Sequence, residues 1–189
     1  GVFACGWRRE DIIDYVEQHF ENKASAMEIT SLLLDECERL YDGRPADDAT
    51  VCTVRIRTSQ PVNLLYGPPS NPNDNYKMMS QFFAKEGKHI VCGGTTSYIA
   101  SQHLGKELTV GFEYIDPGIP PVAELEGVDL VTEGVITVNR VVELARKYLE
   151  DGKSYEEWGD RQDGASRIAR MLCVDATEIH FFVGCAVNP

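Results

Sequence analysis

The sequence lacks several features that would have placed it in a specialised class. No apolar run approaches the roughly 18–20 residues that span a bilayer, and no signal-peptide pattern opens the chain. No Cys-x-x-Cys pair occurs, and the cysteines are scattered over positions 5, 37, 52, 92, 173 and 185. These absences argue against a membrane-spanning protein and against a disulfide framework. We therefore expect reduced thiols and a cytoplasmic protein.

Positive charge is also scarce. The chain carries 18 Lys and Arg against 30 Asp and Glu, a net charge of −12. Such a chain repels phosphate backbones, so we expect neither a nucleic-acid partner nor a membrane partner, whereas divalent cations fit an acidic protein better. With 189 residues, of which 43% are hydrophobic, the sequence suits one large domain, or a small domain with a piece of another.

The first third of the sequence predicts two helices followed by one strand. Apolar residues at helical spacing indicate a helix within residues 7–23. Ser25 and Glu28 form a capping-box pattern for a second helix, which Gly43 ends. Ala49–Arg57 is β-branched and alternating, which predicts a strand. Two helices and one strand cannot close a sheet, so residues 1–58 are interpreted as a fragment of a domain.

From residue 61 onward, strand-like and helix-like segments alternate. The expected strands and apolar runs are residues 61–69, 88–94, 106–112, 128–134 and 177–184, and the expected helices are 71–87, 95–105, 135–152 and 165–175. This alternation predicts an α/β domain over residues 61–189, with a mostly parallel sheet covered by helices on both faces in a Rossmann-like, three-layer arrangement. His180, inside the last strand, is expected to be a core or edge histidine rather than a metal ligand.

The pair Asp47-Asp48 stands just before the predicted strand at 49–57, and two interpretations of it stay open. The surrounding stretch "DGRPADD" is rich in turn formers, and aspartates hydrogen-bond their own backbone in turns. Carboxylates are equally the hard oxygen ligands that Mg²⁺ and Mn²⁺ prefer. On the residues alone, the pair is a solvated turn or part of a metal site.

The stretch "GRPADDATVCTVRI", preceded by a capped helix, resembles the closing segment of the PPM-type, metal-dependent serine/threonine protein phosphatases. The sporulation protein E-like branch of that family is the most similar. The resemblance implies that Asp47 is a metal ligand, and that Asp48 and Thr50 belong to the metal shell or the turn. Residues from about 61 onward resemble an α/β extension fused behind such phosphatase domains in some bacterial proteins, for which no function is implied.

The family resemblance implies a mechanism in which two Mn²⁺ or Mg²⁺ ions activate a water that hydrolyses phosphoserine or phosphothreonine in a phosphoprotein substrate. Gly1-Val2 resembles the end of an Asp-Gly-Val element whose Asp would lie one residue upstream, although Gly1 can equally be a cloning remnant. The other ligands of the family are missing from the chain. We therefore expect the 189-residue chain alone to lack phosphatase activity.

The alternative interpretation is a non-catalytic regulatory or small-ligand-binding α/β module. Its candidate ligand loops follow the predicted buried strands and contain Gly67, Gly93, Gly94, Thr95, Thr96, Glu133 and Gly134. In a parallel sheet these loops gather at the carboxyl edge, where ligands bind. "GGTT" offers N–H groups and hydroxyls to an anion, and Glu133 can accept from a hydroxyl or amine or bind a metal. These glycines can equally serve tight packing only, with Thr95 as a helix cap.

Overall fold

The computed structural model describes residues 7–20, 24–44, 48–111, 114–150 and 154–186. These residues fall into two compact units, divided between Arg57 and Thr58. We call residues 7–57 the helical unit and the residues from Thr58 onward the α/β unit.

The helical unit contains α1 (Arg9–His19) and α2 (Ala26–Leu40). The predicted capping box is confirmed, because the Ser25 hydroxyl accepts from the Glu28 amide at 3.1 Å and the Glu28 carboxylate accepts from the Ser25 amide. The left-handed φ of Gly43, +65°, ends the segment after α2. No side chain of α1 or α2 is fully buried. The described part of this unit therefore has amphipathic helices without a closed core.

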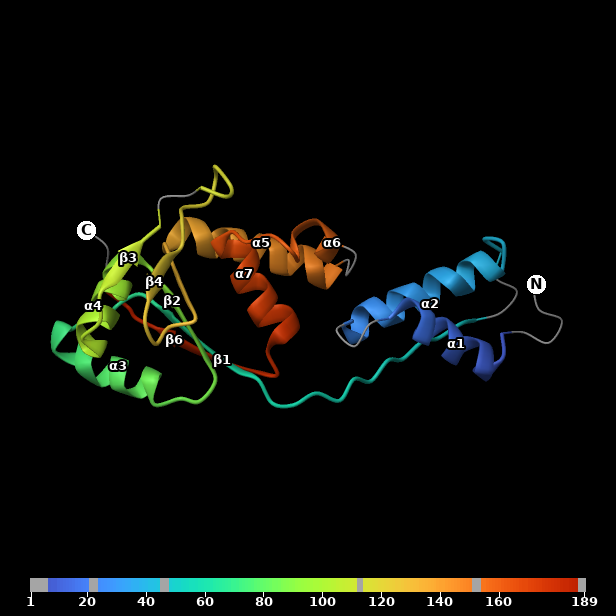
Figure 1. Cartoon of the computed structure of the whole chain (residues 1–189), viewed down its shortest axis with the longest axis horizontal. Coiled ribbons are helices and arrows are strands. Elements are labelled where there is room, and N and C mark those ends of the chain that lie inside the picture. The colour runs from blue at the N-terminus through green and yellow to red at the C-terminus, as the bar shows by residue number, and fades with distance from the viewer. Residues whose placement is uncertain (1–6, 21–23, 45–47, 112–113, 151–153, 187–189) are drawn as a thin grey trace. The chain divides into compact units, whose positions relative to one another are not determined.

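The predicted strand at Ala49–Arg57 is wrong, because residues 48–60 form no strand. The segment runs along α2 instead (Figure 1). The Thr30 hydroxyl donates to the Thr53 hydroxyl at 2.8 Å, and the Arg55 guanidinium donates to the Ala24 carbonyl at 2.6 Å. A β-branched sequence becomes a strand only when another strand supplies hydrogen-bond partners. The described residues of the helical unit contain no such strand.

The α/β unit is built on a six-stranded mixed sheet in the order β3-β4-β5-β2-β1-β6. The strands are β1 (Pro61–Tyr66), β2 (Lys88–Cys92), β3 (Leu108–Val110), β4 (Ala123–Leu125), β5 (Leu130–Thr132) and β6 (Glu178–Val183). The four strands β5, β2, β1 and β6 are mutually parallel. β3 and β4 form an antiparallel hairpin that joins the edge of β5. The expectation of a mostly parallel sheet thus holds for these four strands and fails at the hairpin.

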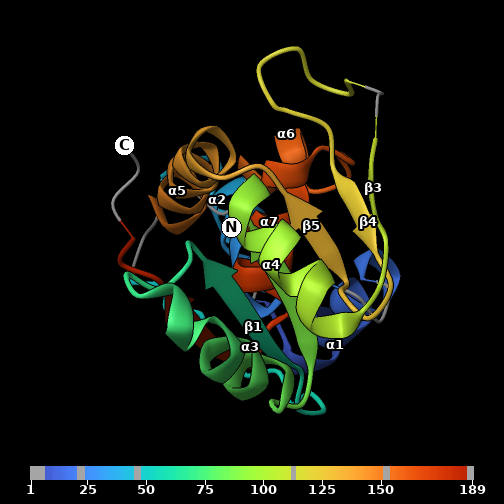
Figure 2. The same ribbon diagram turned by 90° about the vertical axis from the view of Figure 1, so that its left-hand side faces the viewer.

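Helices connect the strands of the α/β unit. They are α3 (Asn75–Phe83), α4 (Gly94–Leu104), α5 (Val135–Glu150), α6 (Tyr155–Trp158) and α7 (Gly164–Arg170), with a 3₁₀ turn at Pro72–Asp74 and a π-helical turn at Met171–Asp175. Figure 2 shows α3 and α4 in front of the sheet, and α5 and α7 behind it. The helix that follows β2 and the helix that follows β5 therefore leave the sheet in opposite directions.

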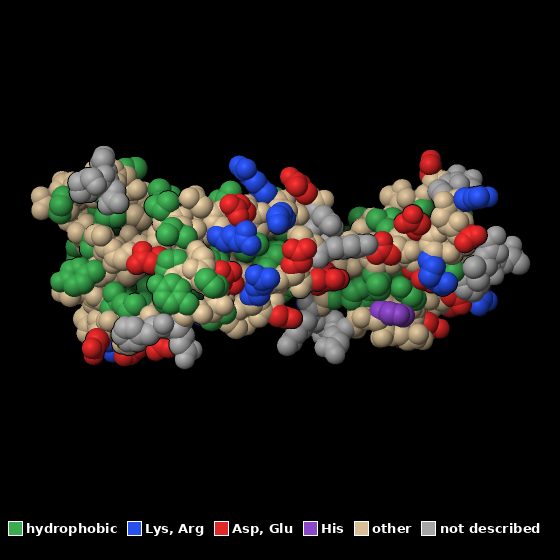
Figure 3. Space-filling model, turned by 90° about the horizontal axis from the view of Figure 1, so that it is seen from above, with side chains coloured by type: hydrophobic (Ala, Val, Ile, Leu, Met, Phe, Trp, Pro, Cys, Tyr) green, Lys and Arg blue, Asp and Glu red, His purple; other side chains and the backbone are tan. Residues whose placement is uncertain are grey.

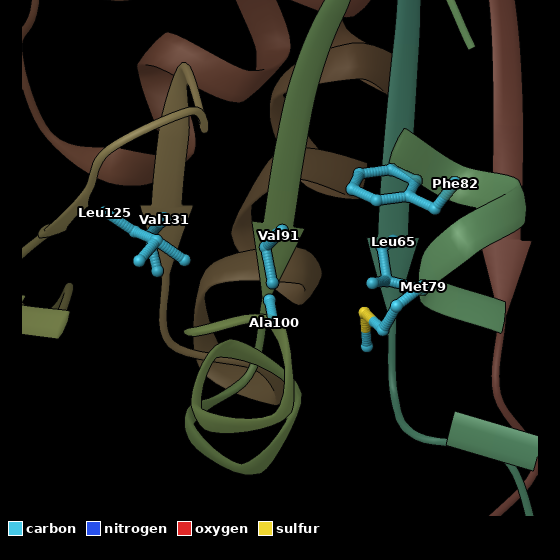
Figure 4. Close-up of a cluster of buried hydrophobic side chains, with 7 residues drawn as sticks. All are labelled: Leu65, Met79, Phe82, Val91, Ala100, Leu125 and Val131. Carbon is cyan, nitrogen blue, oxygen red and sulfur yellow. The ribbon is translucent and has the colours of Figure 1, made fainter. Parts of the chain in front are cut away.

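The core cluster between the sheet and the helices α3 and α4 comprises Leu65, Met79, Phe82, Val91, Ala100, Leu125 and Val131, all buried (Figure 4). In the register of the parallel strands, Leu65 pairs with Val91 and the neighbouring pair is Val91 with Val131. These three residues point to one face because side chains alternate along a strand. The buried face of α3 is formed by Met79 and Phe82, which are fully buried, with Met78 and Phe83 packed against them.

Two elements were missed by the sequence patterns. Neither β4, within the proline-rich stretch at 115–127, nor α6, whose Trp158 is buried, is among the strands and helices expected from the sequence. Both are short, three and four residues long, so neither has enough residues to show a period. The other helices and strands of the α/β unit follow one another in the predicted order.

Candidate functional site

The carboxyl ends of the parallel strands meet at one edge of the sheet, which is the site expected for an open α/β fold. The loop after β2 begins at Gly93 and the loop after β5 is Glu133-Gly134. Because α4 and α5 leave toward opposite faces of the sheet (Figure 2), these two loops diverge at this point. A crevice between diverging loops is where open α/β sheets hold their ligands.

The two loops touch through their glycines. The Gly93 amide donates to the Thr132 carbonyl at 2.8 Å. A Cβ at Gly134 would lie 3.4 Å from the Gly93 Cα, so the two loops are in van der Waals reach of each other. Gly93 also has φ of +109°, a conformation that side chains rarely adopt. Two of the predicted loop glycines are therefore brought together, and the backbone conformation of Gly93 requires glycine there.

The N-terminus of α4 opens onto this edge. Gly93 is its N-cap residue, and no side chain caps the helix. The expectation that Thr95 caps it is therefore wrong. Thr95 is exposed and Thr96 is buried. The first amides of a helix have no acceptor within the helix, so α4 presents uncapped N–H groups and one exposed hydroxyl at the edge.

Glu133 lies next to the start of α4. Its Oε1 is 3.6 Å from the position that a Cβ of Gly94 would take, and its Oε2 is 3.4 Å from the Gly134 amide. The side chain is exposed. A carboxylate beside a helix N-terminus interacts favourably with the helix dipole. It also places an acceptor for a hydroxyl or amine beside the N–H donors of α4.

The loops after β1 and β6 are bound to each other rather than open. The Gly184 amide donates to the Tyr66 carbonyl at 2.9 Å, and the Ala186 amide donates to the Pro68 carbonyl at 3.1 Å. Gly67, with φ of +76°, approaches the Gly184 backbone closely. Its position is explained by packing between the two loops. Among the predicted loop residues, Gly67 therefore contacts the loop after β6 and not the loops that contain Gly93 and Glu133.

Two buried groups that the sequence patterns do not single out, Cys92 and Thr132, stand at the ends of β2 and β5, directly before these loops. The Thr132 hydroxyl donates to the Glu133 carbonyl at 3.0 Å and lies 3.5 Å from Cys92 Sγ. Burial raises the pKa of the Cys92 thiol to about 11, only partly opposed by the Thr132 hydroxyl. Cys92 therefore stays protonated at neutral pH and is not an activated nucleophile. The only signal for it in the sequence was its position at the end of a buried strand.

A hollow lies between α3 and α4. It holds about 350 Å³ and is lined by Asn75, Tyr76, Met79, Tyr98, Gln102 and His103, among others. The Asn75 Oδ1 atom is buried there without a hydrogen-bond partner. No pattern in the sequence distinguished these residues, because they come from two helices and are brought together only by packing.

The predicted metal site is not assembled in the part of the chain that the structure describes. Asp47 lies outside the described residues. Asp48 and Thr50 are described and exposed. Among the described residues, no group of three or more His, Cys, Asp or Glu is placed to hold a metal ion. The described residues thus do not provide the ligand set that the family resemblance implies.

Basic and acidic side chains are interspersed on the surface of the α/β unit. Figure 3 shows Lys and Arg gathered over α5 with Asp and Glu beside them. On α5 itself, Arg140 pairs with Glu143 at 2.8 Å. Local pairing of this kind weakens the field of the basic groups. Within the described residues, no helix is long and apolar enough to cross a membrane.

Comparisons with known proteins add no family assignment. No protein-family model, no curated protein and no solved structure matches this chain.

Proposed function

We propose that the α/β unit is a small-ligand-binding module of Rossmann-like, three-layer design, whose ligand binds at the carboxyl edge of the sheet. The observation that carries the proposal is the contact between the Gly93 and Gly134 loops at the point where α4 and α5 diverge. The uncapped amides of α4 favour an anionic group. Glu133 favours a hydroxyl or amine on the same ligand. A hydroxylated or amino-bearing small anion, such as a sugar phosphate or an amino acid, meets both conditions.

Thermal unfolding of the chain with a panel of such compounds tests this proposal. The panel contains inorganic phosphate, nucleoside monophosphates, sugar phosphates and amino acids. A ligand at about 100 times its Kd stabilises the folded protein by about 2.7 kcal/mol and raises the midpoint by several degrees. If no class in the panel raises the midpoint, the proposal is wrong.

Two substitutions then locate the ligand. Glu133→Gln keeps the size of the side chain and removes its charge, and Thr95→Ala removes the exposed hydroxyl. We expect each to weaken binding about tenfold, the effect of losing one hydrogen bond to a charged or polar ligand. Glu157→Gln and Thr109→Ala are matched controls at exposed positions of α6 and β3. Equal binding by all four variants would place the ligand elsewhere.

A second proposal concerns the helical unit. We propose that it is the C-terminal fragment of a PPM-type phosphatase domain, with Asp47 as a ligand for Mn²⁺ or Mg²⁺. Its supporting observations are the capped α2, the extended segment held beside it by the Thr30–Thr53 hydrogen bond, and the absence of any fully buried side chain in α1 and α2. A last strand and its preceding helices, separated from the rest of their domain, would have these properties.

The phosphatase proposal requires a longer protein that supplies the remaining ligands. In such a protein, Asp47→Asn is expected to abolish Mn²⁺-dependent hydrolysis of a phosphopeptide while far-UV circular dichroism is unchanged. Asp42→Asn, five positions earlier in the sequence, is the control. The 189-residue chain alone is expected to be inactive with p-nitrophenyl phosphate. Activity of that chain, lost on Asp47→Ala, would contradict the expectation, and full activity of the longer Asp47→Asn variant would contradict the proposal.

A further inference from the structure

The sheet of the α/β unit has two edges that differ in length and composition. One edge is β3, with three residues, and the other is β6, with six. Among the described residues, β6 pairs with β1 only. Edge strands are usually protected by Pro, Lys or a bulge, or by being short. The β6 sequence "EIHFFV" contains no Pro, Lys or Arg, so its edge is long and unprotected.

One face of β6 is apolar and exposed. Ile179, Phe181 and Val183 are 39%, 61% and 60% exposed. They alternate with Phe182, which points to the opposite face and packs against Phe82 with ring centroids 5.3 Å apart. The buried face of β6 therefore packs against α3. The apolar side chains on its other face are not covered by any of the described residues. A contiguous apolar row on a sheet edge marks an association surface.

Ile179, Phe181 and Val183 also direct their backbone N–H and C=O groups away from β1, toward the open edge of the sheet. The Gly184 amide donates to the Tyr66 carbonyl of β1 at 2.9 Å. In a parallel strand, alternate residues direct their N–H and C=O groups to the same neighbour. By this alternation His180 and Phe182 face β1, and Ile179, Phe181 and Val183 face the open side of the sheet. The free hydrogen-bonding row and the apolar row thus belong to one set of residues.

We infer that β6 is a self-association strand, which pairs antiparallel with β6 of a second copy of this chain. A second copy fits this edge because the apolar row of β6 is self-complementary. When Phe181 lies opposite the partner's Phe181, Ile179 lies opposite the partner's Val183, and Val183 opposite the partner's Ile179. Every exposed apolar side chain then meets another, and the outward backbone groups of all three pairs are satisfied. A two-fold axis through Phe181 closes the assembly.

Charge does not oppose this register. Glu178 is the only acidic residue of β6, and in this pairing it lies opposite the partner's Gly184. The two copies of Glu178 are therefore at opposite ends of the paired strands. Stable protein interfaces bury on the order of 800 Å² per partner, whereas one strand pair with three apolar side chains supplies only part of that area. We therefore expect a reversible dimer with a Kd on the order of 10–100 µM.

Sedimentation equilibrium of the 189-residue chain from about 1 to 200 µM tests the inference. Phe181→Lys places two cations opposite each other at the two-fold axis and is expected to raise the Kd at least about tenfold. Because Phe181 is exposed, the variant is expected to fold, which far-UV circular dichroism and the thermal midpoint check. Val110→Lys, at the exposed edge strand β3, is the matched control and is expected to leave the Kd unchanged.

Cysteine cross-linking tests the register independently of affinity. In the proposed pair, the Cα atoms of the two residues at position 181 are about 5.5 Å apart, within the range for a disulfide. Val183 lies opposite the partner's Ile179, which is four residues along the strand from the partner's Val183. The Cα atoms of the two residues at position 183 are therefore about 13 Å apart. Phe181→Cys is therefore expected to form a disulfide-linked dimer on mild oxidation, identified by the linked peptide in mass spectrometry, whereas Val183→Cys is not.

Three results would overturn the inference. The first is a chain that stays monomeric up to about 200 µM. The second is a dimer that Phe181→Lys leaves intact, and the third is a dimer that Val110→Lys weakens as much as Phe181→Lys does. Cross-linking at 183 in preference to 181 would likewise reject the proposed register.

Discussion

Gly164, the first residue of α7, lies directly against Thr132, the last residue of β5. A Cβ at position 164 would stand 2.9 Å from Thr132 Cγ2, closer than real Cβ contacts allow. The contact sets how near α7 approaches the carboxyl edge of the sheet. It also adjoins the loop after β5, because Thr132 is hydrogen-bonded to Glu133 and lies beside Cys92.

We expect Gly164→Ala to destabilise the α/β unit by about 1–3 kcal/mol, the usual cost of overpacking. Chemical denaturation measures it. Thr132→Ser removes the clashing methyl while keeping the hydroxyl, so the double variant should recover most of the lost stability. Gly94→Ala is the control, since it is also the first residue of a helix and its Cβ would meet only Glu133 Oε1 at 3.6 Å. A Gly164→Ala variant as stable as Gly94→Ala would show that α7 packs less tightly than described.

Phe82 is the central aromatic residue of the core on the α3 side. Its ring lies 4.9 Å from that of Phe83, 4.9 Å from that of His89 and 5.3 Å from that of Phe182, and the side chain is fully buried. Phe82→Ala should cost about 3–5 kcal/mol of unfolding free energy, because it removes buried area and leaves a cavity. Tyr76→Ala, on the same helix but 75% exposed, should change stability by less than about 0.5 kcal/mol. Similar losses of unfolding free energy in both variants would contradict the central position of Phe82 in the core.

Because the Cys92 thiol is buried, we expect the folded protein to lose stability at alkaline pH. Its folded pKa is about 11, raised by burial from an ordinary value of 9.0. Between pH 9 and 11 the unfolded chain loses this proton while the folded protein keeps it. The stability that is fully present below pH 9 is therefore lost as the pH rises toward 11, by about 2–3 kcal/mol. Cys92→Ala should flatten this limb of the stability curve, whereas Cys52→Ala should not.

The same burial predicts the order of thiol reactivity. Cys52 and Cys185 are exposed and Cys92 is buried. At pH 8 the first two should react with iodoacetamide at least about 100-fold faster than Cys92, because the thiolate is the reactive form. Peptide mass spectrometry assigns each modified residue. Rapid labelling of Cys92 in the folded chain would argue that β2 is accessible.

Backbone amides distinguish the segment beside α2 from a true strand. We expect the amides of residues 51–56 to exchange with deuterium at least about tenfold faster than those of β1, because no strand ladder protects them. Val54 and Ile56 are 82% and 95% exposed, whereas Leu65 of β1 is fully buried. Hydrogen–deuterium exchange with peptide resolution measures this difference. Equal protection in the two segments would mean that residues 51–56 are paired.

The sequence by itself determined the order of elements in the α/β unit. Met79 and Phe82 lie at helical spacing, and "KHIVC" is short, apolar and bounded by glycines, so local periodicity was enough to assign α3, β2 and their buried faces. Ser25 and Glu28 likewise specified the start of α2, because a capping box is a contact between residues three positions apart.

Tertiary structure alone decided which of these segments became partners. Ala49–Arg57 has the composition of a strand but forms none, and β4, within a proline-rich stretch, pairs with β5. The contact of Gly93 with Gly134 and the exposure of Phe181 on an open edge likewise depend on residues distant in sequence. The physical reason is that a helix closes its hydrogen bonds within one segment, whereas a strand and a binding crevice exist only through what another segment brings beside them.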